Sequence, residues 1–253
     1  MKRKIQQALD AIVNVVREWE AADTLTLIQL SDDLYDPYFF ISLDLYFRGE
    51  IPGAAERSVM FDFTGGFESS GINRKDRFLL DDIPFRIEYK DISRFDTIIH
   101  DSLNQSVAIR DSGTYMFHRI VTSDVIFRKS GWIESARSDL AQLPDGFWAG
   151  ARTSSQVSME HYLGDLAAAV MREDELFYVY SLSGFIKSAL RTVFSINRRF
   201  EPSPRQLKEE ALLLDVLPDS FQGLLESLLR HEDRSWTRKR EIAELLAKRI
   251  VQL

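Results

Sequence analysis

The most informative stretch of the sequence is YFFISLDLYF, at residues 38–47. It is aromatic and almost continuously apolar, interrupted by Ser42 and Asp44. An apolar run of this length, followed by the turn residues Gly49 and Pro52, predicts a buried strand. Because side chains alternate along a strand, we expect Ser42 and Asp44 on the same face.

One helix and two further strands are predicted around this stretch. Residues 3–20 place apolar side chains three and four positions apart, which is typical of an amphipathic helix. The segment TLTLIQLS at 24–31 predicts a strand, because it is rich in Leu, Ile and Thr and is followed by turn-forming residues. The segment IPFRIEYKD at 83–91 predicts another, with Arg86 and Glu88 on one face and apolar residues on the other.

The remaining parts of the chain divide into irregular and helical segments. Residues 53–75 are rich in glycine and serine and predict an ordered loop or a hairpin, and residues 113–132 predict short pieces joined by turns. From Gly131 onward the apolar residues follow the helical period, with prolines at the breaks. The predicted fold class is therefore α+β, with a mixed sheet and helices at 1–140 and an all-helical bundle at 141–253.

Composition restricts the classes of function. The chain has 253 residues, no cysteine and a formal net charge of -7. Without cysteine there are no disulfides, thiolate zinc sites or cysteine nucleophiles. The negative charge argues against a non-specific nucleic-acid binder, which needs surplus Lys and Arg. The sequence contains neither an apolar run of about 18 residues nor a secretory signal, so we expect a cytoplasmic protein without a membrane partner.

Two carboxylates in apolar strands, Asp44 and Glu88, are the candidates for chemistry. Burying a charge in a sheet costs several kcal/mol unless the charge is paired or binds a cation. If both acids share a face, they form an oxygen site of the kind that holds Mg²⁺. In the alternative, Asp44 reaches solvent or an arginine such as Arg86, and Glu88 belongs to a solvated face with Arg86 and Lys90.

The order of elements around these acids resembles the N-terminal signature of the nucleotidyltransferase superfamily, which includes kanamycin nucleotidyltransferase and polymerase beta. A helix is followed by a strand ending at Ser31, a loop, and a strand with the pattern S-x-D-L, and Ser31 stands 13 residues before Asp44. The resemblance implies a nucleotidyltransferase-like sheet domain in which Ser31 contacts phosphate and Asp44 binds metal. It also implies that Glu88 is the third carboxylate, which shares the metal or activates the acceptor hydroxyl.

The sequence departs from this signature at three positions. Leu30 and Tyr35 replace its two glycines, and Ser42 replaces its first aspartate. Ser42 therefore remains as a nucleotide contact rather than a metal ligand. The missing carboxylate weakens the case for two-metal catalysis.

The C-terminal half carries a second resemblance. Residues 189–218 resemble the helical domain that follows many bacterial nucleotidyltransferase-like domains, with Asn197, Arg198 and Arg199 at a helix end and Arg205 beyond it. The resemblance implies that Arg198 and Arg205 contact the nucleotide, and arginine forks suit phosphate oxygens. Alternatively these are solvated cations at a helix C-terminus, where positive charge is favoured.

Three functions are compatible with these features. The first is an enzyme that uses Mg²⁺ and ATP or another NTP to transfer a nucleotide to the hydroxyl of a small-molecule acceptor, with Asp44 and Glu88 as catalytic residues. The second is a degenerate relative that binds a nucleotide or a protein partner without catalysis. The third is an interaction module whose helical half contacts another chain.

Overall fold

The chain folds into two compact units, each described here by itself. The structure is a computed structural model that describes residues 2–28, 40–61, 65–70, 74–104, 113–230 and 235–253. The sheet unit comprises Met1–Asp101 and Arg119–Gln142, and the helical unit comprises Ser102–His118 and Leu143–Leu253. The chain therefore passes from the sheet unit to the helical unit, returns, and passes over once more.

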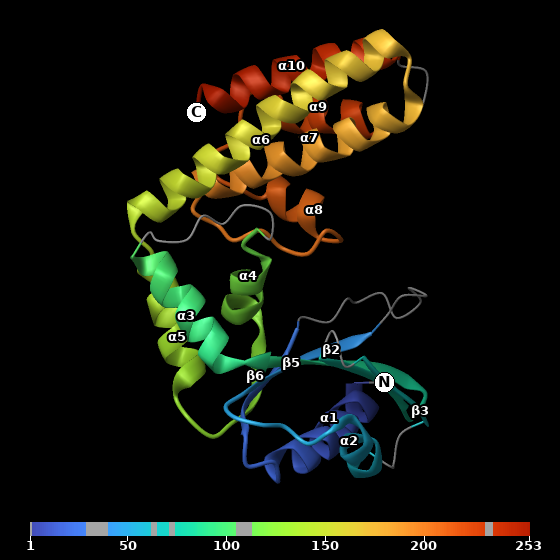
Figure 1. Cartoon of the computed structure of the whole chain (residues 1–253), viewed down its shortest axis with the longest axis vertical. Coiled ribbons are helices and arrows are strands. Elements are labelled where there is room, and N and C mark those ends of the chain that lie inside the picture. The colour runs from blue at the N-terminus through green and yellow to red at the C-terminus, as the bar shows by residue number, and fades with distance from the viewer. Residues whose placement is uncertain (1, 29–39, 62–64, 71–73, 105–112, 231–234) are drawn as a thin grey trace. The chain divides into compact units, whose positions relative to one another are not determined.

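The sheet unit is built on a mixed six-stranded sheet (Figure 1). Its strands follow the order β3-β4-β5-β2-β1-β6. The central pair, β2 and β5, is parallel, and the other neighbouring pairs are antiparallel. The strands are β1 Ala22–Leu27, β2 Ile41–Phe47, β3 Gly65–Ser70, β4 Lys75–Leu80, β5 Ile83–Asp91 and β6 Asp124–Arg128.

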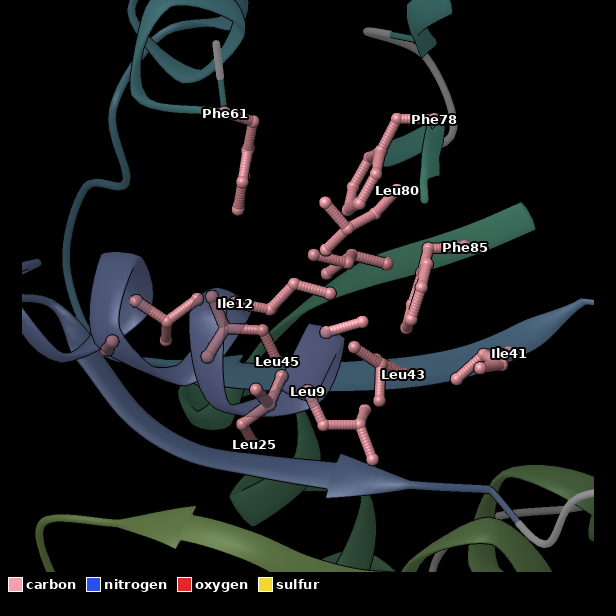
Figure 2. Close-up of a cluster of buried hydrophobic side chains, with 14 of the residues drawn as sticks. Leu9, Ile12, Leu25, Ile41, Leu43, Leu45, Phe61, Phe78, Leu80 and Phe85 are labelled. Atoms are coloured by element: carbon pink, nitrogen blue, oxygen red, sulfur yellow. The ribbon is translucent and has the colours of Figure 1, made fainter. Parts of the chain in front are cut away.

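Helices α1 and α2 lie on one face of this sheet (Figure 1). Leu9 and Ile12 of α1 point toward Leu43 and Leu45 of β2 in an apolar core (Figure 2). The three- and four-residue spacing of the apolar positions in α1 places them together on its buried side. The helices described wholly in this unit are α1 Lys2–Arg17, α2 Ala54–Met60 and α5 Trp132–Ala141. Helix α3 Ile92–Leu103 begins here and ends in the helical unit, and α4 Tyr115–Thr122 begins in the helical unit and ends here.

Strand β2 is buried on both of its faces, which explains its nearly continuous apolar sequence. On the face opposite α1, the ring of Tyr46 packs 5.6 Å from Phe95 of α3 and 4.8 Å from Trp132 of α5. Ser42 and Asp44 lie on this second face, where charges from other elements surround them. Full burial of β2 therefore includes its carboxylate, and Asp44 has no exposed surface.

A buried ionic network links α2 to the sheet on the core side. Arg57 of α2 donates two hydrogen bonds to Asp76 of β4, at 2.7 and 3.0 Å, and the hydroxyl of Tyr89 donates a third at 2.5 Å. Burial, followed by the charge of Asp76, raises the pKa of Tyr89 well above its usual value, so the hydroxyl keeps its proton. The guanidinium of Arg57 also stacks 4.6 Å from the centre of the Tyr89 ring.

The predicted α+β class is confirmed, and two local predictions are corrected. Residues 113–132 contain helix α4, where extended pieces were expected. The aromatic and β-branched residues of YMFHRIV favour an extended chain by propensity, but tertiary packing overrides that propensity. Within the loop or hairpin expected at 53–75, the structure has α2 and then β3, and β4 begins at Lys75. The segment KDRFLL of β4 alternates between buried and exposed residues, but the sequence does not reveal this, because three charged residues, including buried Asp76, precede three apolar ones.

The helical unit is organised around a hairpin of the two longest helices, α6 and α7 (Figure 1). Only Glu173 and Asp174 separate them: Glu173 adopts the left-handed conformation that ends α6, and the Asp174 carboxylate accepts a hydrogen bond from the Phe177 amide at 3.0 Å. The helices of this unit are α6 Asp145–Arg172, α7 Glu175–Ile196, α8 Leu207–Leu212, α9 Phe221–Leu229 and α10 Trp236–Val251. Among the described helices, none combines the length and the apolar character that a membrane span requires.

Two glycines in this hairpin provide a matched test of its packing. A Cβ atom at Gly184 of α7 would lie 2.4 Å from the Tyr162 ring of α6, whereas one at exposed Gly164 would meet nothing within 4 Å. We expect Gly184→Ala to lower the free energy of unfolding by about 1–3 kcal/mol through overpacking. Gly164→Ala is expected to raise it by up to about 1 kcal/mol, because alanine favours helix more than glycine does. Urea unfolding followed by circular dichroism would measure both, and equal effects would contradict the close approach of Tyr162.

Candidate functional site

The parallel register of β2 and β5 places the predicted site residues side by side. Ser42 lies opposite Arg86, and Asp44 lies opposite Glu88. The Ser42 hydroxyl accepts a hydrogen bond from Arg86 Nη2 at 2.8 Å. The antiparallel register of β4 and β5 adds Lys75 opposite Glu88 and Arg77 opposite Arg86. Strands from separate parts of the sequence thus assemble one polar face.

Both carboxylate oxygens of Asp44 are paired with cations. Arg119 of α4 donates hydrogen bonds to both carboxylate oxygens, from Nε at 2.7 Å and from Nη2. The ammonium of Lys90 lies 3.2 Å from Oδ2. Asp44 is 0% exposed and Arg119 is 4% exposed, so this two-point ion pair is shielded from water.

Glu88 lies at the exposed side of the same ion pair. Its carboxylate oxygens are 3.3 Å from Arg119 Nη1, 3.4 Å from Lys75 Nζ and 3.6 Å from Arg86 Nε. Burial raises the pKa of Glu88, but the neighbouring cations, with Arg119 first, outweigh burial and hold the pKa below its usual value. Glu88 is therefore ionised at neutral pH and acts as a counter-ion.

We call this group of side chains the charged cluster. Its members are Asp44, Lys75, Arg77, Arg86, Glu88, Lys90 and Arg119. These cations outnumber its two carboxylates and Glu68 of β3, a third carboxylate, which lies opposite Arg77. Arg77 and Arg86 also carry like charges at directly opposite positions of an antiparallel pair, an arrangement that is destabilising by itself.

Several polar atoms on this face of the sheet lack hydrogen-bond partners among the residues that the structure describes. They are Thr26 Oγ1, Tyr46 Oη and Arg86 Nε, all of which are buried. Thr26 lies opposite Asp44 in the register of β1 and β2. Burial, followed by the charge of Asp44, raises the pKa of Tyr46 well above its usual value, so its hydroxyl remains a donor. Hydrogen-bonding capacity therefore remains beside the cations.

The carboxylates in this arrangement do not fit a Mg²⁺ site. Magnesium takes oxygen ligands at about 2.0–2.1 Å in octahedral geometry. Both oxygens of Asp44 already accept hydrogen bonds from Arg119, and cations surround Glu88. Within the described ranges of the chain, no group of three or more His, Cys, Asp or Glu side chains could hold a metal ion. The charges of the cluster favour an anion.

Other residues singled out from the sequence lie elsewhere. Ser31 lies outside the described residues, as do Leu30 and Tyr35. Arg198 belongs to the helical unit, where it has a positive φ of 51° and forms an exposed ion pair with Asp145 at 2.8 Å. Arg205 is an exposed residue of the same unit.

The sequence reasoning considered the carboxylates but missed Arg119, their principal partner. Arg119 is the one charged residue in the segment YMFHRIV. A charge in an apolar run needs a partner, and this holds for the arginine as it does for Asp44. The overlooked signal is therefore a pair of opposite charges, each placed in its own apolar segment.

Comparison with known proteins bears on the fold. The structure is similar to the crystal structure of a nucleotidyltransferase-like protein from Exiguobacterium sibiricum, with a TM-score of 0.51 and a sequence identity of 13%. The match covers 98% of this chain and 74% of that chain. No protein-family model and no curated protein matches the sequence. At this level of identity the likeness concerns the fold alone, and the chain has a nucleotidyltransferase-like fold.

Proposed function

We propose that this protein binds the phosphate groups of a nucleotide at the charged cluster and does so without a metal ion. The observation that carries this proposal is the surplus of cations around two carboxylates that are already paired, with Arg77 and Arg86 directly opposite each other. A phosphate placed between these arginines would relieve their repulsion and accept charge-assisted hydrogen bonds. The fold supports a nucleotide as the ligand, because it is nucleotidyltransferase-like.

In this proposal the two carboxylates organise the cations. Asp44, at the buried side of the cluster, pairs with Arg119 and Lys90. Glu88, at its exposed side, pairs with Lys75 and Arg86. Such pairing fixes the geometry of long side chains before the ligand arrives, which lowers the entropy cost of binding. The partly exposed cations are Arg86, Lys75 and Arg77, which are the groups that would contact phosphate.

Metal-dependent nucleotidyl transfer to a small-molecule hydroxyl is the second candidate. It is favoured by the register that sets Asp44 beside Glu88 and by the fold. Ser31 and Ser42 would then contact the nucleotide, and Mg²⁺ with ATP or another NTP would be required. The present pairing of both acids with cations favours the first candidate.

Isothermal titration calorimetry with ATP distinguishes the two. We expect wild-type protein to bind ATP in EDTA, and to bind it more weakly when Mg²⁺ is in excess, because the metal neutralises the phosphates that the cluster attracts. Arg86→Gln is expected to weaken binding about tenfold or more, since one charge-assisted hydrogen bond contributes about 1.5–3 kcal/mol. Arg17→Gln, at an exposed position of α1, is the matched control and should leave the affinity unchanged.

The opposite result, ATP binding that depends on Mg²⁺, would favour metal-dependent nucleotidyl transfer. Binding that requires Mg²⁺ and is lost in Glu88→Gln would show that the acids hold a metal. Glu88 is partly exposed, so this variant avoids the folding defect that a change at buried Asp44 would cause. Absence of ATP binding in both EDTA and Mg²⁺ would refute both candidates.

A further inference from the structure

The helical unit contains a large apolar cavity that is distinct from the charged cluster. Its volume is about 710 Å³, which falls in the range of about 300–1,000 Å³ typical of small-molecule sites. Helices α7, α9 and α10 line it together with the segment around α8. The apolar walls include Val179, Leu182, Ile186, Leu190, Pro204 and Leu207.

The cavity is elongated along α7. Its lining residues on this helix recur every four positions, from Tyr178 through Leu182 and Ile186 to Leu190. At 1.5 Å per residue, these positions extend over about 18 Å of helix. An elongated ligand therefore fits this space better than a compact one.

One end of the cavity carries positive charge. Arg191 and Glu201 neutralise each other through two hydrogen bonds, at 2.8 and 3.0 Å. Lys187, one turn before Arg191, forms no ion pair within the described part of the chain. Its ammonium group can therefore balance one negative charge on a ligand. Lys239 of α10 also lines the cavity but is buried, at 9% exposure, whereas Lys187 is exposed and can meet the carboxylate of an incoming ligand.

The other end carries a buried polar group that has no partner among the described residues. Tyr178 is 5% exposed, and its hydroxyl makes no hydrogen bond within that part of the chain. Its ring is held in place by stacking on Trp236, with 4.7 Å between ring centres. Leaving a buried hydroxyl unsatisfied costs about 1–3 kcal/mol, and a ligand oxygen at this end would remove that cost.

We infer that this cavity binds an elongated apolar molecule with a carboxylate at one end and an oxygen atom at the other, such as an ω-hydroxy fatty acid. The carboxylate pairs with Lys187, the chain lies along Leu182 and Ile186, and the far oxygen accepts a hydrogen bond from Tyr178. No bond is made or broken in this binding. The inference does not depend on nucleotide binding at the sheet.

Calorimetric titration of the full chain with three ligands of equal length tests this assignment. We expect 12-hydroxydodecanoate to bind most tightly, followed by dodecanoate, which lacks the far oxygen, and then dodecan-1-ol, which lacks the carboxylate. Lys187→Gln should weaken both acids about tenfold and leave the alcohol unchanged. Lys208→Gln, at a half-exposed lysine of the same unit, is the matched control and should bind like the wild type.

Two further variants locate the ligand. Ile186→Trp fills the cavity and should abolish binding of all three ligands, with circular dichroism confirming that the variant is folded. Tyr178→Phe should reduce the affinity for 12-hydroxydodecanoate to that of dodecanoate while leaving dodecanoate unchanged. The inference is overturned if the wild type binds neither acid saturably, or if both acids bind folded Ile186→Trp and Lys187→Gln as they bind the wild type.

Discussion

Replacing Arg119 with methionine is expected to lower the free energy of unfolding of the sheet unit by about 3–5 kcal/mol, because it leaves a buried carboxylate without its main partner. Asp44 has no exposed surface and accepts both hydrogen bonds of the Arg119 fork. Lys90 remains 3.2 Å away, but a single ammonium cannot replace two aligned donors. Methionine preserves most of the apolar stem of the arginine side chain, so the loss of stability is due to the missing charge and its hydrogen bonds.

Urea unfolding followed by tryptophan fluorescence would measure this effect in the correct unit. Trp19 and Trp132 belong to the sheet unit, while Trp148 and Trp236 belong to the helical unit. A background in which the last two are phenylalanine makes the signal specific to the sheet unit, which avoids treating two units as one transition.

An exposed arginine provides the control for this measurement. Arg48 pairs with Asp96 at 3.1 Å, but both side chains are about half exposed, so Arg48→Met should cost less than about 1 kcal/mol. The double variant Asp44→Asn with Arg119→Met should recover part of the loss, because the unpaired charge is gone. A cost for Arg119→Met as small as that for Arg48→Met would contradict a shielded ion pair.

Replacing Asp76 with asparagine is expected to have an effect of similar size, about 3–5 kcal/mol, by leaving the buried guanidinium of Arg57 without its counter-ion. Asp76 is fully buried and accepts hydrogen bonds from both Arg57 and Tyr89. Tyr89→Phe removes one donor and should cost about 1–3 kcal/mol. The same fluorescence measurement applies, since the network lies within the sheet unit.

The neighbouring residue on β4 separates this effect from a general weakness of the strand. Arg77 follows Asp76 directly and is exposed on the opposite face of the sheet. Arg77→Met is therefore expected to change the free energy of unfolding by no more than about 0.5 kcal/mol. If Asp76→Asn cost no more than Arg77→Met, the network would be shown to add little to stability.

The sequence predicted the centre of the fold because its periodicity there is strong. Strand β5 begins and ends where the pattern placed it, at Ile83 and Asp91, and the condition that Asp44 and Glu88 share a face is met. The weaker edge of the sheet was predicted only as a loop or a hairpin, without its strands. Strand β3 is GGFESS, with a single large apolar residue, so its register depends on pairing with β4 rather than on a pattern of its own.

The surroundings of the acids could not be predicted in the same way. The contact between Asp44 and Arg119 spans 75 residues of sequence, and periodicity within a single segment does not reveal partners at that distance. The sequence therefore indicated that Asp44 needed a cation but not whether a metal or an arginine would supply it. The structure supplies an arginine, and with it the reason to consider anions.

The three passages of the chain between the units affect how the protein can be synthesised or divided. Gly113 and Thr114 belong to the helical unit, where the Thr114 hydroxyl accepts a hydrogen bond from the amide of Glu201 at 2.8 Å. A recombinant fragment that starts at Leu143 would lack that hydroxyl, and one that stops at Asp101 would lack strand β6 and Arg119. On the ribosome, Thr114 emerges well before Glu201, so their hydrogen bond forms only after residue 201 has been synthesised. Neither unit is therefore a contiguous piece that a single cut, in a gene or in a purified chain, could release whole.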